Sequence, residues 1–303
     1  MPNDLTPRCV AADLGFTEGP LWTTRGSLML VGMSRGMIHD IDPATGTVRT
    51  AAETGGSPSG LAEDAQGRVW VAQGGHPPAR GGRPAAPGIQ CLSPPGIGTP
   101  GQKPADVDDV LTEGFDAPND LVIGPDGRLW FTDPRGPALA GTPEPGRLWV
   151  FDPRPGPGTV AAAVVAQGAF FPNGLAFAPD GDALYVAETF TGRILRYRRN
   201  GAGLSAPAVF ATLPEGRPDG LAFDRAGHLL VAATTAFAVL VLDPTGRTVE
   251  RIPLGDGALA TNLCFGGPEL RTLYITSPKG GRVFAVERTI PGLPLPPFRT
   301  AGR

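Results

Sequence analysis

Short runs of alternating apolar and polar residues recur along the chain, and each run meets a turn that contains glycine. The clearest copies span residues 119–131, 173–186 and 219–231, where a second alternating run follows the turn. Period-two alternation predicts half-buried β-strands, and the glycine between two such runs predicts a tight hairpin, because glycine tolerates the positive φ of these turns. Each copy therefore predicts the first two strands of a sheet.

Three weaker copies, which begin at Glu18, Ser59 and Thr261, bring the number of repeats to six. The six copies begin at positions 18, 59, 119, 173, 219 and 261, so their spacings are 41, 60, 54, 46 and 42 residues. Units of about four strands repeated every 40 to 50 residues are typical of propeller blades. The pattern predicts an all-β fold: a six-bladed β-propeller of four-stranded antiparallel blades around a central channel, with residues 1–303 as a single domain.

The two longest spacings contain stretches dense in proline and glycine, from Gly74 to Val110 and from Pro134 to Gly146. We interpret both as insertions, which serve either as solvated loops or as walls of a substrate site. The N-terminal run from Arg8 to Ala12 is expected to supply the missing outer strand of the last blade, because that pairing closes the ring without leaving a free edge.

The composition supports an ordered chain, since 41% of the residues are apolar although it holds 44 glycines and 35 prolines. A formal charge of −3 without a basic run disfavours nucleic acid and anionic membranes as partners. No signal peptide and no run of about 20 apolar residues is visible, so a cytoplasmic protein is expected. The three cysteines lack metal-ligand spacing, which disfavours a zinc site or a disulfide framework.

The first strands of all blades in a propeller run in the same direction, so the residues that precede them are expected at one end of the channel. In the six copies these residues all carry side-chain oxygen: Glu18, Ser59, Asn119, Asn173, Asp219 and Thr261. Turn preference explains Asn, Asp and Ser at such positions but not the glutamate. Mixed carboxylate and amide oxygens suit Ca²⁺, whereas zinc favours His or Cys and Mg²⁺ keeps more water.

These segments resemble the senescence marker protein/gluconolactonase/luciferin-regenerating enzyme family, calcium-dependent six-bladed propeller lactonases related to diisopropylfluorophosphatase and the paraoxonases. The resembling segments are residues 18–22, 118–121, 126–133, 172–175, 218–221 and 264–267. The resemblance places Glu18, Asn119, Asn173 and Asp219 on the family's metal-ligand positions. It implies Ca²⁺ as the cofactor, with Mg²⁺, Mn²⁺ or Zn²⁺ as substitutes.

We therefore expect a metal-dependent hydrolase that opens a small sugar-type lactone, a gluconolactonase-like carboxylic ester hydrolase. A cation at the channel mouth would polarise the lactone carbonyl and stabilise the oxyanion that develops when water attacks. Asp219 is the catalytic candidate, with the roles of general base, nucleophile and simple ligand all open. Glu18 is expected to be a ligand alone.

Loops between the second and third strands of each blade should share the metal's end of the propeller. They supply the candidates for contact with a lactone or ester substrate, and Asp120 joins them as a neighbour of Asn119 that either orients a ligand or caps a turn. The candidate substrate-binding residues are Arg35, His76, Asp120, Arg135, Phe190 and Phe237, with Met33 and Lys279 on similar loops.

Two other functions fit the same pattern. The metal could serve arylester or organophosphate hydrolysis, because a fold does not fix its chemistry. The propeller could also be a non-catalytic binding module with a structural ion. The stretch from Gly96 to Gly101 matches a dinucleotide fingerprint by letter, but it lacks the strand and helix that give that fingerprint its meaning. The sequence leaves the oligomeric state open.

Overall fold

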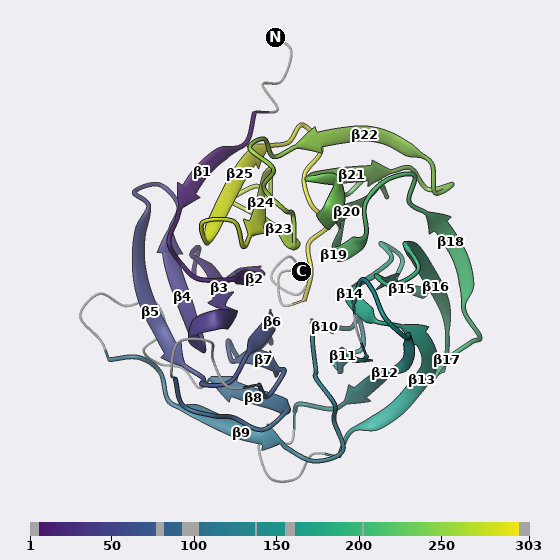
Figure 1. The fold of residues 1–303 in the computed structure, drawn as a ribbon, viewed down its shortest axis with the longest axis horizontal. Helices are drawn as coiled ribbons and strands as arrows, with labels where there is room; N and C mark the ends of the chain where they lie inside the picture. The colour runs from purple at the N-terminus through teal and green to yellow at the C-terminus, as the bar shows by residue number, and fades with distance from the viewer. Residues whose placement is uncertain are drawn as a thin grey trace.

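The computed structural model of the protein describes residues 6–76, 82–92, 103–136, 138–154, 161–201 and 203–296. Across these residues, six antiparallel sheets stand as blades around a central axis (Figure 1). Each blade has four strands that run from the axis to the rim, and the fourth blade also carries the short strand β17 (Gly203–Leu204). The predicted six-bladed propeller is confirmed.

The blades are numbered from the one that begins with β2. The strands at the axis are β2 (Thr17–Trp22), β6 (Pro58–Glu63), β10 (Leu121–Ile123), β14 (Pro172–Phe177), β19 (Pro218–Phe223) and β23 (Asn262–Gly266). The second strands are β3 (Leu28–Gly32), β7 (Val69–Gln73), β11 (Leu129–Arg135), β15 (Ala183–Glu188), β20 (Leu229–Ala233) and β24 (Thr272–Ser277). The third strands are β4 (Met37–Asp42), β8 (Gly88–Leu92), β12 (Glu144–Phe151), β16 (Arg193–Asn200), β21 (Ala238–Leu242) and β25 (Arg282–Glu287). The outer strands are β5 (Thr47–Glu53), β9 (Val107–Leu111), β13 (Ala163–Phe170), β18 (Ala208–Thr212), β22 (Thr248–Pro253) and β1 (Arg8–Ala11).

Helical structure in the described ranges is limited to two single 3₁₀ turns, η1 (Met33–Arg35) and η2 (Thr234–Ala236). Each joins the second and third strands of its blade. Within the same ranges, no helix has the length and apolar character needed to cross a membrane.

The N-terminal strand closes the ring as the sequence predicts. β1 pairs antiparallel with β25, with Arg8 opposite Ala285 and Cys9 opposite Phe284. The interpretation of Gly74 to Val110 as one long insertion was wrong in part, because β8 and the first residues of β9 lie inside it as strands of the second blade. Its glycines and prolines obscured the alternation by which strands were recognised.

The hydrophobic core consists of six clusters among the described residues, each wedged between two neighbouring blades. β20 shows how one strand serves two of them. Leu229 and Val231 pack toward the fourth blade, whereas Leu230 and Ala232 pack toward the sixth. Alternate residues of a strand point to opposite faces, so a strand buried on both faces must be apolar throughout.

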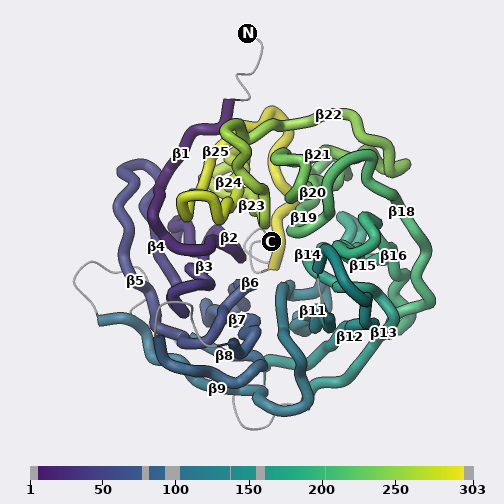
Figure 2. Tube along the Cα trace, viewed as in Figure 1, coloured from purple at the N-terminus to yellow at the C-terminus, as the bar shows by residue number. Residues whose placement is uncertain are grey.

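The chain returns to the axis after its last strand. Gly292 forms a bridge with Asp224, and the Leu293 N–H donates to the carbonyl of Phe223 at 2.9 Å. Figure 2 shows this final segment, in yellow, running from the rim to the centre of the ring. It lies at the end of the channel where the first strands finish, opposite the end where they begin. We call the latter end the mouth.

Candidate metal and active site

The six predicted ring residues lie where the strands at the axis begin. Glu18, Ser59, Asn173 and Asp219 are each the second residue of their strand, whereas Asn119 and Thr261 precede theirs. The sequence predicted that all six would precede the strands, and for four of them this was wrong. In those four blades, pairing with the second strand begins one residue before the ring residue, and the register then shifts before the strand's next paired leucine. Such a bulge re-aims a side chain.

The residue after each ring residue separates two kinds of blade. Four blades have glycine there: Gly19, Gly60, Gly174 and Gly220. A Cβ on Gly19 would lie 2.2 Å from the carbonyl oxygen of Ser59, and one on Gly174 would lie 2.3 Å from that of Asp219. Such close approach is open only to glycine, and it brings the ring residues of neighbouring blades together.

The third and sixth blades have Asp120 and Asn262 at this position. The two residues make the same local hydrogen bonds. The backbone N–H of Asp120 donates to the hydroxyl of Thr132, and that of Asn262 donates to the hydroxyl of Thr276, both at 3.0 Å. Each Oδ1 accepts the N–H of the following leucine, at 2.9 and 2.8 Å. Asn262 was missed from the sequence, although its place in the repeat, where most copies have glycine, marks it.

Hydrogen bonds tie the ring across blade boundaries. The Asn173 amide donates to the hydroxyl of Thr189 at 3.2 Å, and that hydroxyl donates to the carbonyl of Pro218 at 2.7 Å, one residue before Asp219. The Thr261 hydroxyl donates to the carbonyl of Thr17 at 3.0 Å, one residue before Glu18. Asn173 and Asp219 are thus held as a unit, as are Thr261 and Glu18.

Three buried carboxyl groups meet at the ring. Burial raises the pKa of Glu18 to about 8 and the nearby Asp120 carboxylate adds to this, while the Gly19 N–H opposes it. Burial also raises the pKa of Asp219 well above its usual range, with Glu18 and Asp120 adding to the shift. The pKa of Asp120 is raised to about 6, again mainly by burial. None of the three forms an ion pair with a described basic residue, so no described cationic side chain offsets the charge that these groups carry when they ionise.

The donors at the ring decide which cation fits. Within the described ranges, no three His, Cys, Asp or Glu side chains are placed to hold a metal by themselves. A metal at the ring would therefore need neutral oxygen donors besides carboxylates, and the ring positions offer the amides of Asn119 and Asn173 beside the carboxyl groups of Glu18 and Asp219. An oxygen-only set with two carboxylates fits Ca²⁺, which accepts mixed carboxylate and amide ligands.

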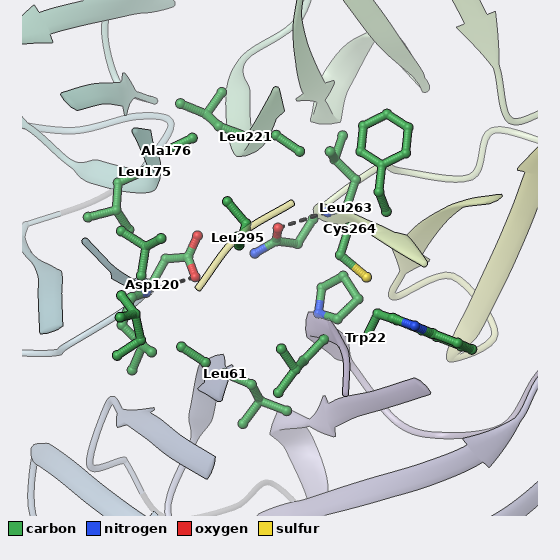
Figure 3. Close-up of a pocket in the computed structure, with 18 of the residues that line it drawn as sticks. Trp22, Leu61, Asp120, Leu175, Ala176, Leu221, Leu263, Cys264 and Leu295 are labelled. Atoms are coloured by element: carbon green, nitrogen blue, oxygen red, sulfur yellow. Dashed lines mark hydrogen bonds between the residues drawn. The ribbon is translucent and has the colours of Figure 1, made fainter. Parts of the chain in front are cut away.

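A cavity of about 120 Å³ continues the channel on the far side of Asp120 and Asn262. Figure 3 shows Asp120 at its edge, with Leu61, Leu175, Leu221 and Leu263 pointing inward and Leu295 of the final segment across it. The residues that directly follow this position in the six blades are all apolar: Pro20, Leu61, Leu121, Leu175, Leu221 and Leu263. The ring therefore has an apolar floor, and an ion or polar ligand is disfavoured on that side because the cavity offers it few hydrogen-bond partners.

The predicted substrate-binding residues lie at the mouth end, on the turns that follow the second strands. Arg35 ends η1, Phe237 follows η2 with 43% of its surface exposed, and Phe190 lies in the turn after β15. His76 follows β7 and is exposed. Arg135 ends β11, where its Nε lies 3.2 Å from an oxygen of Asp116.

Asp120, the remaining candidate, is buried at the ring itself. Met33 and Lys279 also lie on mouth-end turns, the latter donating from Nζ to the carbonyl of Asp256. The structure thus brings Asp120 together with Glu18 and Asp219, and it places the other candidates on the turns around the mouth.

Comparisons with known proteins agree with this architecture. The family described as SMP-30/Gluconolactonase/LRE-like region matches residues 102–279. The chain is 36% identical over 154 residues to a 6-deoxy-6-sulfogluconolactonase of Pseudomonas putida, a match that covers 45% of this chain and 53% of that protein. The chain thus spans about half the length of that curated relative.

Two solved structures cover nearly the whole chain. A gluconolactonase from Xanthomonas campestris superposes with a TM-score of 0.70 at 27% identity, covering 92% of this chain and 88% of the other. A calcium-binding protein, regucalcin, from Agrobacterium tumefaciens superposes with a TM-score of 0.71 at 21% identity, covering 98% and 96%. The second likeness supports the fold.

Proposed function

The chain belongs to the SMP-30/gluconolactonase/LRE-like family, and from that premise we propose that it is a calcium-dependent lactonase. It opens a small sugar-type lactone at the mouth of the channel, where Glu18, Asn119, Asn173 and Asp219 hold the ion. Relatives named as a sulfogluconolactonase and a gluconolactonase support this substrate class.

One observation carries the proposal: buried carboxyl groups from three blades converge without a basic partner among the described residues. Desolvation of Glu18 and Asp219 favours their neutral forms. A structure that gathers such groups without a counter-charge is destabilised, unless a bound cation offsets the repulsion. Asn173, anchored by Thr189, adds an amide oxygen on the same side of the ring.

A bound divalent cation supplies polarisation of the lactone carbonyl and stabilisation of the developing negative charge. Asp219 takes a proton from the attacking water while the new C–O bond forms at the carbonyl carbon. The ring C–O bond then breaks, and the proton passes to the leaving oxygen, which gives a hydroxy acid. Asn173 and the bulge in β19 fix the direction of the Asp219 carboxylate, and the apolar floor keeps water on the mouth side.

A panel of lactones followed with a pH indicator tests the proposal. The purified protein should open at least one sugar lactone, lose that activity after treatment with a chelator, and regain it with added Ca²⁺. Calorimetric titration should show Ca²⁺ binding that Asp219→Asn weakens, and the same substitution should lower kcat by about 10³-fold or more.

The matched control is Asp243→Asn, since Asp243 is an aspartate of the same blade that pairs with Arg247 at the opposite end. It should change neither Ca²⁺ affinity nor turnover. Loss of thermal stability on chelation, with no lactone opened at any Ca²⁺ concentration, would instead identify a structural ion in a binding module.

A further inference from the structure

Arginines at the mouth end differ in whether a carboxylate neutralises them. Arg135 lies 3.2 Å from Asp116, and Arg193 lies 2.6 Å from Glu188. Arg217 has no ion-pair partner in the described part of the chain, and its guanidinium makes a single bond there, from Nη1 to the carbonyl of Phe190 at 2.9 Å. An unpaired, half-buried cation is thus retained beside the site.

The backbone places Arg217 close to the ring. It stands two residues before Asp219, directly ahead of Pro218, the first residue of β19. Its carbonyl accepts the N–H of Thr234 at 2.9 Å, and the next carbonyl accepts the Thr189 hydroxyl that also receives the Asn173 amide. Arg217 is therefore fixed at the sector of the mouth that Asn173 and Asp219 share.

Other unpaired arginines at this end are placed differently. Arg83 donates from Nη2 to the carbonyl of Thr54, and the side chain of Arg35 packs beside Gly15. Both belong to the first and second blades, across the ring from the boundary between the fourth and fifth blades where Arg217 lies. Arg282 of the sixth blade, which also has no ion pair with a described residue, donates from Nε to the carbonyl of Lys279 at 2.8 Å. Arg217 alone among them adjoins a proposed ligand in sequence.

The neighbouring turn η2 ends in an apolar residue, Phe237, whose backbone is strained. η1 and η2 are equivalent turns, and each ends in a residue with left-handed backbone: Gly36 in the first blade, with φ of 63°, and Phe237 in the fifth, with φ of 56°. A bulky residue in this region is strained by about 1–2 kcal/mol. The phenyl ring of Phe237 is nevertheless exposed, so packing in the core does not account for it. Thr234 joins this turn to Arg217.

We propose that the lactone carries an anionic oxygen group, a sulfonate or a group of like charge and shape, which Arg217 binds. The inference rests on the proposed lactonase function and narrows its substrate class. One N–H of the guanidinium is used by Phe190, and no described residue accepts from Nη2 or Nε, which can donate two parallel bonds to an oxyanion. Phe237 covers the carbon skeleton between this group and the ring.

The test compares two lactones, glucono-1,5-lactone and its 6-deoxy-6-sulfo analogue. The substitution Arg217→Gln should lower kcat/KM for the sulfonated lactone by about 10- to 100-fold, mainly through KM, and change the neutral lactone by less than about threefold. Arg217→Lys keeps the charge but loses the paired bonds, so its kcat/KM for the sulfonated lactone should lie between those of wild type and Arg217→Gln. The control Arg225→Gln removes an exposed arginine, without an ion pair to any described residue, from the opposite end of the same blade and should affect neither lactone.

Equal losses on both lactones would overturn the inference, since they would show that Arg217 only supports the Phe190 turn. Unchanged kinetics on the sulfonated lactone would overturn it as well. If Arg217→Gln does not fold, Arg217→Lys and a titration of wild type with the ring-opened sulfonate, against the neutral acid, decide the matter: equal affinities reject the inference. A wild-type protein that opens neither lactone rejects the proposed function instead.

Discussion

Four blades of this propeller place glycine after their ring residue, whereas the third and sixth place Asp120 and Asn262 there. In the glycine blades the backbone of the next blade approaches closely enough to exclude any side chain: a Cβ on Gly220 would lie 2.6 Å from the Cα of Asn262. In the other two blades a polar side chain fills the space and accepts the N–H of the next residue. The two side chains come from opposite blades of the ring.

The six copies of the repeat therefore have two different structural roles at this position. Glycine blades bring backbones together and so draw Glu18, Asn173 and Asp219 toward the axis. The two exceptions supply polar groups between the ring and its apolar floor, and the Asn262 side chain lowers the pKa values of both Glu18 and Asp120. Two copies of the repeat thus have a polar residue where the other four have glycine, and both of these polar residues lie at the ring.

The largest effect is expected from giving a glycine blade a side chain. Gly174→Ala would put Cβ 2.3 Å from the carbonyl oxygen of Asp219 and 2.6 Å from the Cα of Gly220, so the fourth and fifth blades must separate. Overpacking against backbone should destabilise the fold by about 3 kcal/mol and lower Tm by roughly 5–10 °C. Scanning calorimetry measures this.

Gly203→Ala is the control, because the nearest atom to a Cβ there is 3.9 Å away. Its Tm should stay within about 2 °C of wild type. A Gly174→Ala protein as stable as this control would show that the blades are not packed against each other at the ring.

Much of this arrangement could be predicted, because the repeat carries the information. Six equivalent positions in one sequence must lie at equivalent points of a ring, so the six ring residues could be chosen before any coordinates were known. The family resemblance then selected Glu18, Asn119, Asn173 and Asp219 among them. In five blades the sequence also has leucine two residues after the ring position, and the same comparison of repeats reveals it.

Other features depend on contacts between blades and left no periodic signal. Arg217 is distinguished by having no ion-pair partner among the described residues, whereas Arg135 and Arg193 pair with Asp116 and Glu188. The strand β8 was hidden because Gly88 begins it and proline-rich sequence precedes it. The left-handed backbone of Phe237 could not be predicted from a residue that normally avoids it.

A smaller effect is expected from making the third blade like the sixth. Asp120→Asn keeps the shape and the bond from the Leu121 N–H but removes one carboxylate from the group formed with Glu18 and Asp219. As a positioning residue, Asp120 should contribute about 10- to 100-fold to Ca²⁺ affinity or turnover. Both are measured, by calorimetry and by lactone opening.

A purely structural Asp120 would lower Tm while leaving Ca²⁺ affinity unchanged, and that result would contradict the assignment. Asp126→Asn serves as the control, since Asp126 is an aspartate in the hairpin turn of the same blade, paired with Arg128 away from the mouth. It should leave Ca²⁺ affinity unaltered.

The last effect, which requires no substitution, is a pH dependence of stability in the chelated protein. The pKa of Glu18 is raised in the fold from 4.5 to about 8, so the folded state holds a proton that the unfolded state releases. This contribution to stability is fully present below pH 4.5 and is lost as pH rises through about 8. The Tm of the metal-free protein should therefore fall across this window, by roughly 2–4 °C for each kcal/mol lost.

Exchanging the two exceptional residues sharpens the prediction. Asn262→Asp adds a fourth buried carboxyl group and should steepen the fall in Tm with pH, because like charges disfavour ionisation together. Asp120→Asn should make the fall shallower, and Glu18→Gln should remove the part that Glu18 contributes and reduce the part from Asp219. Saturating Ca²⁺ should abolish the dependence in wild type, since a bound dication favours the ionised carboxylates. If the chelated Asn262→Asp and Asp120→Asn proteins gave the same profile as wild type, these side chains would not share one electrostatic site with Glu18.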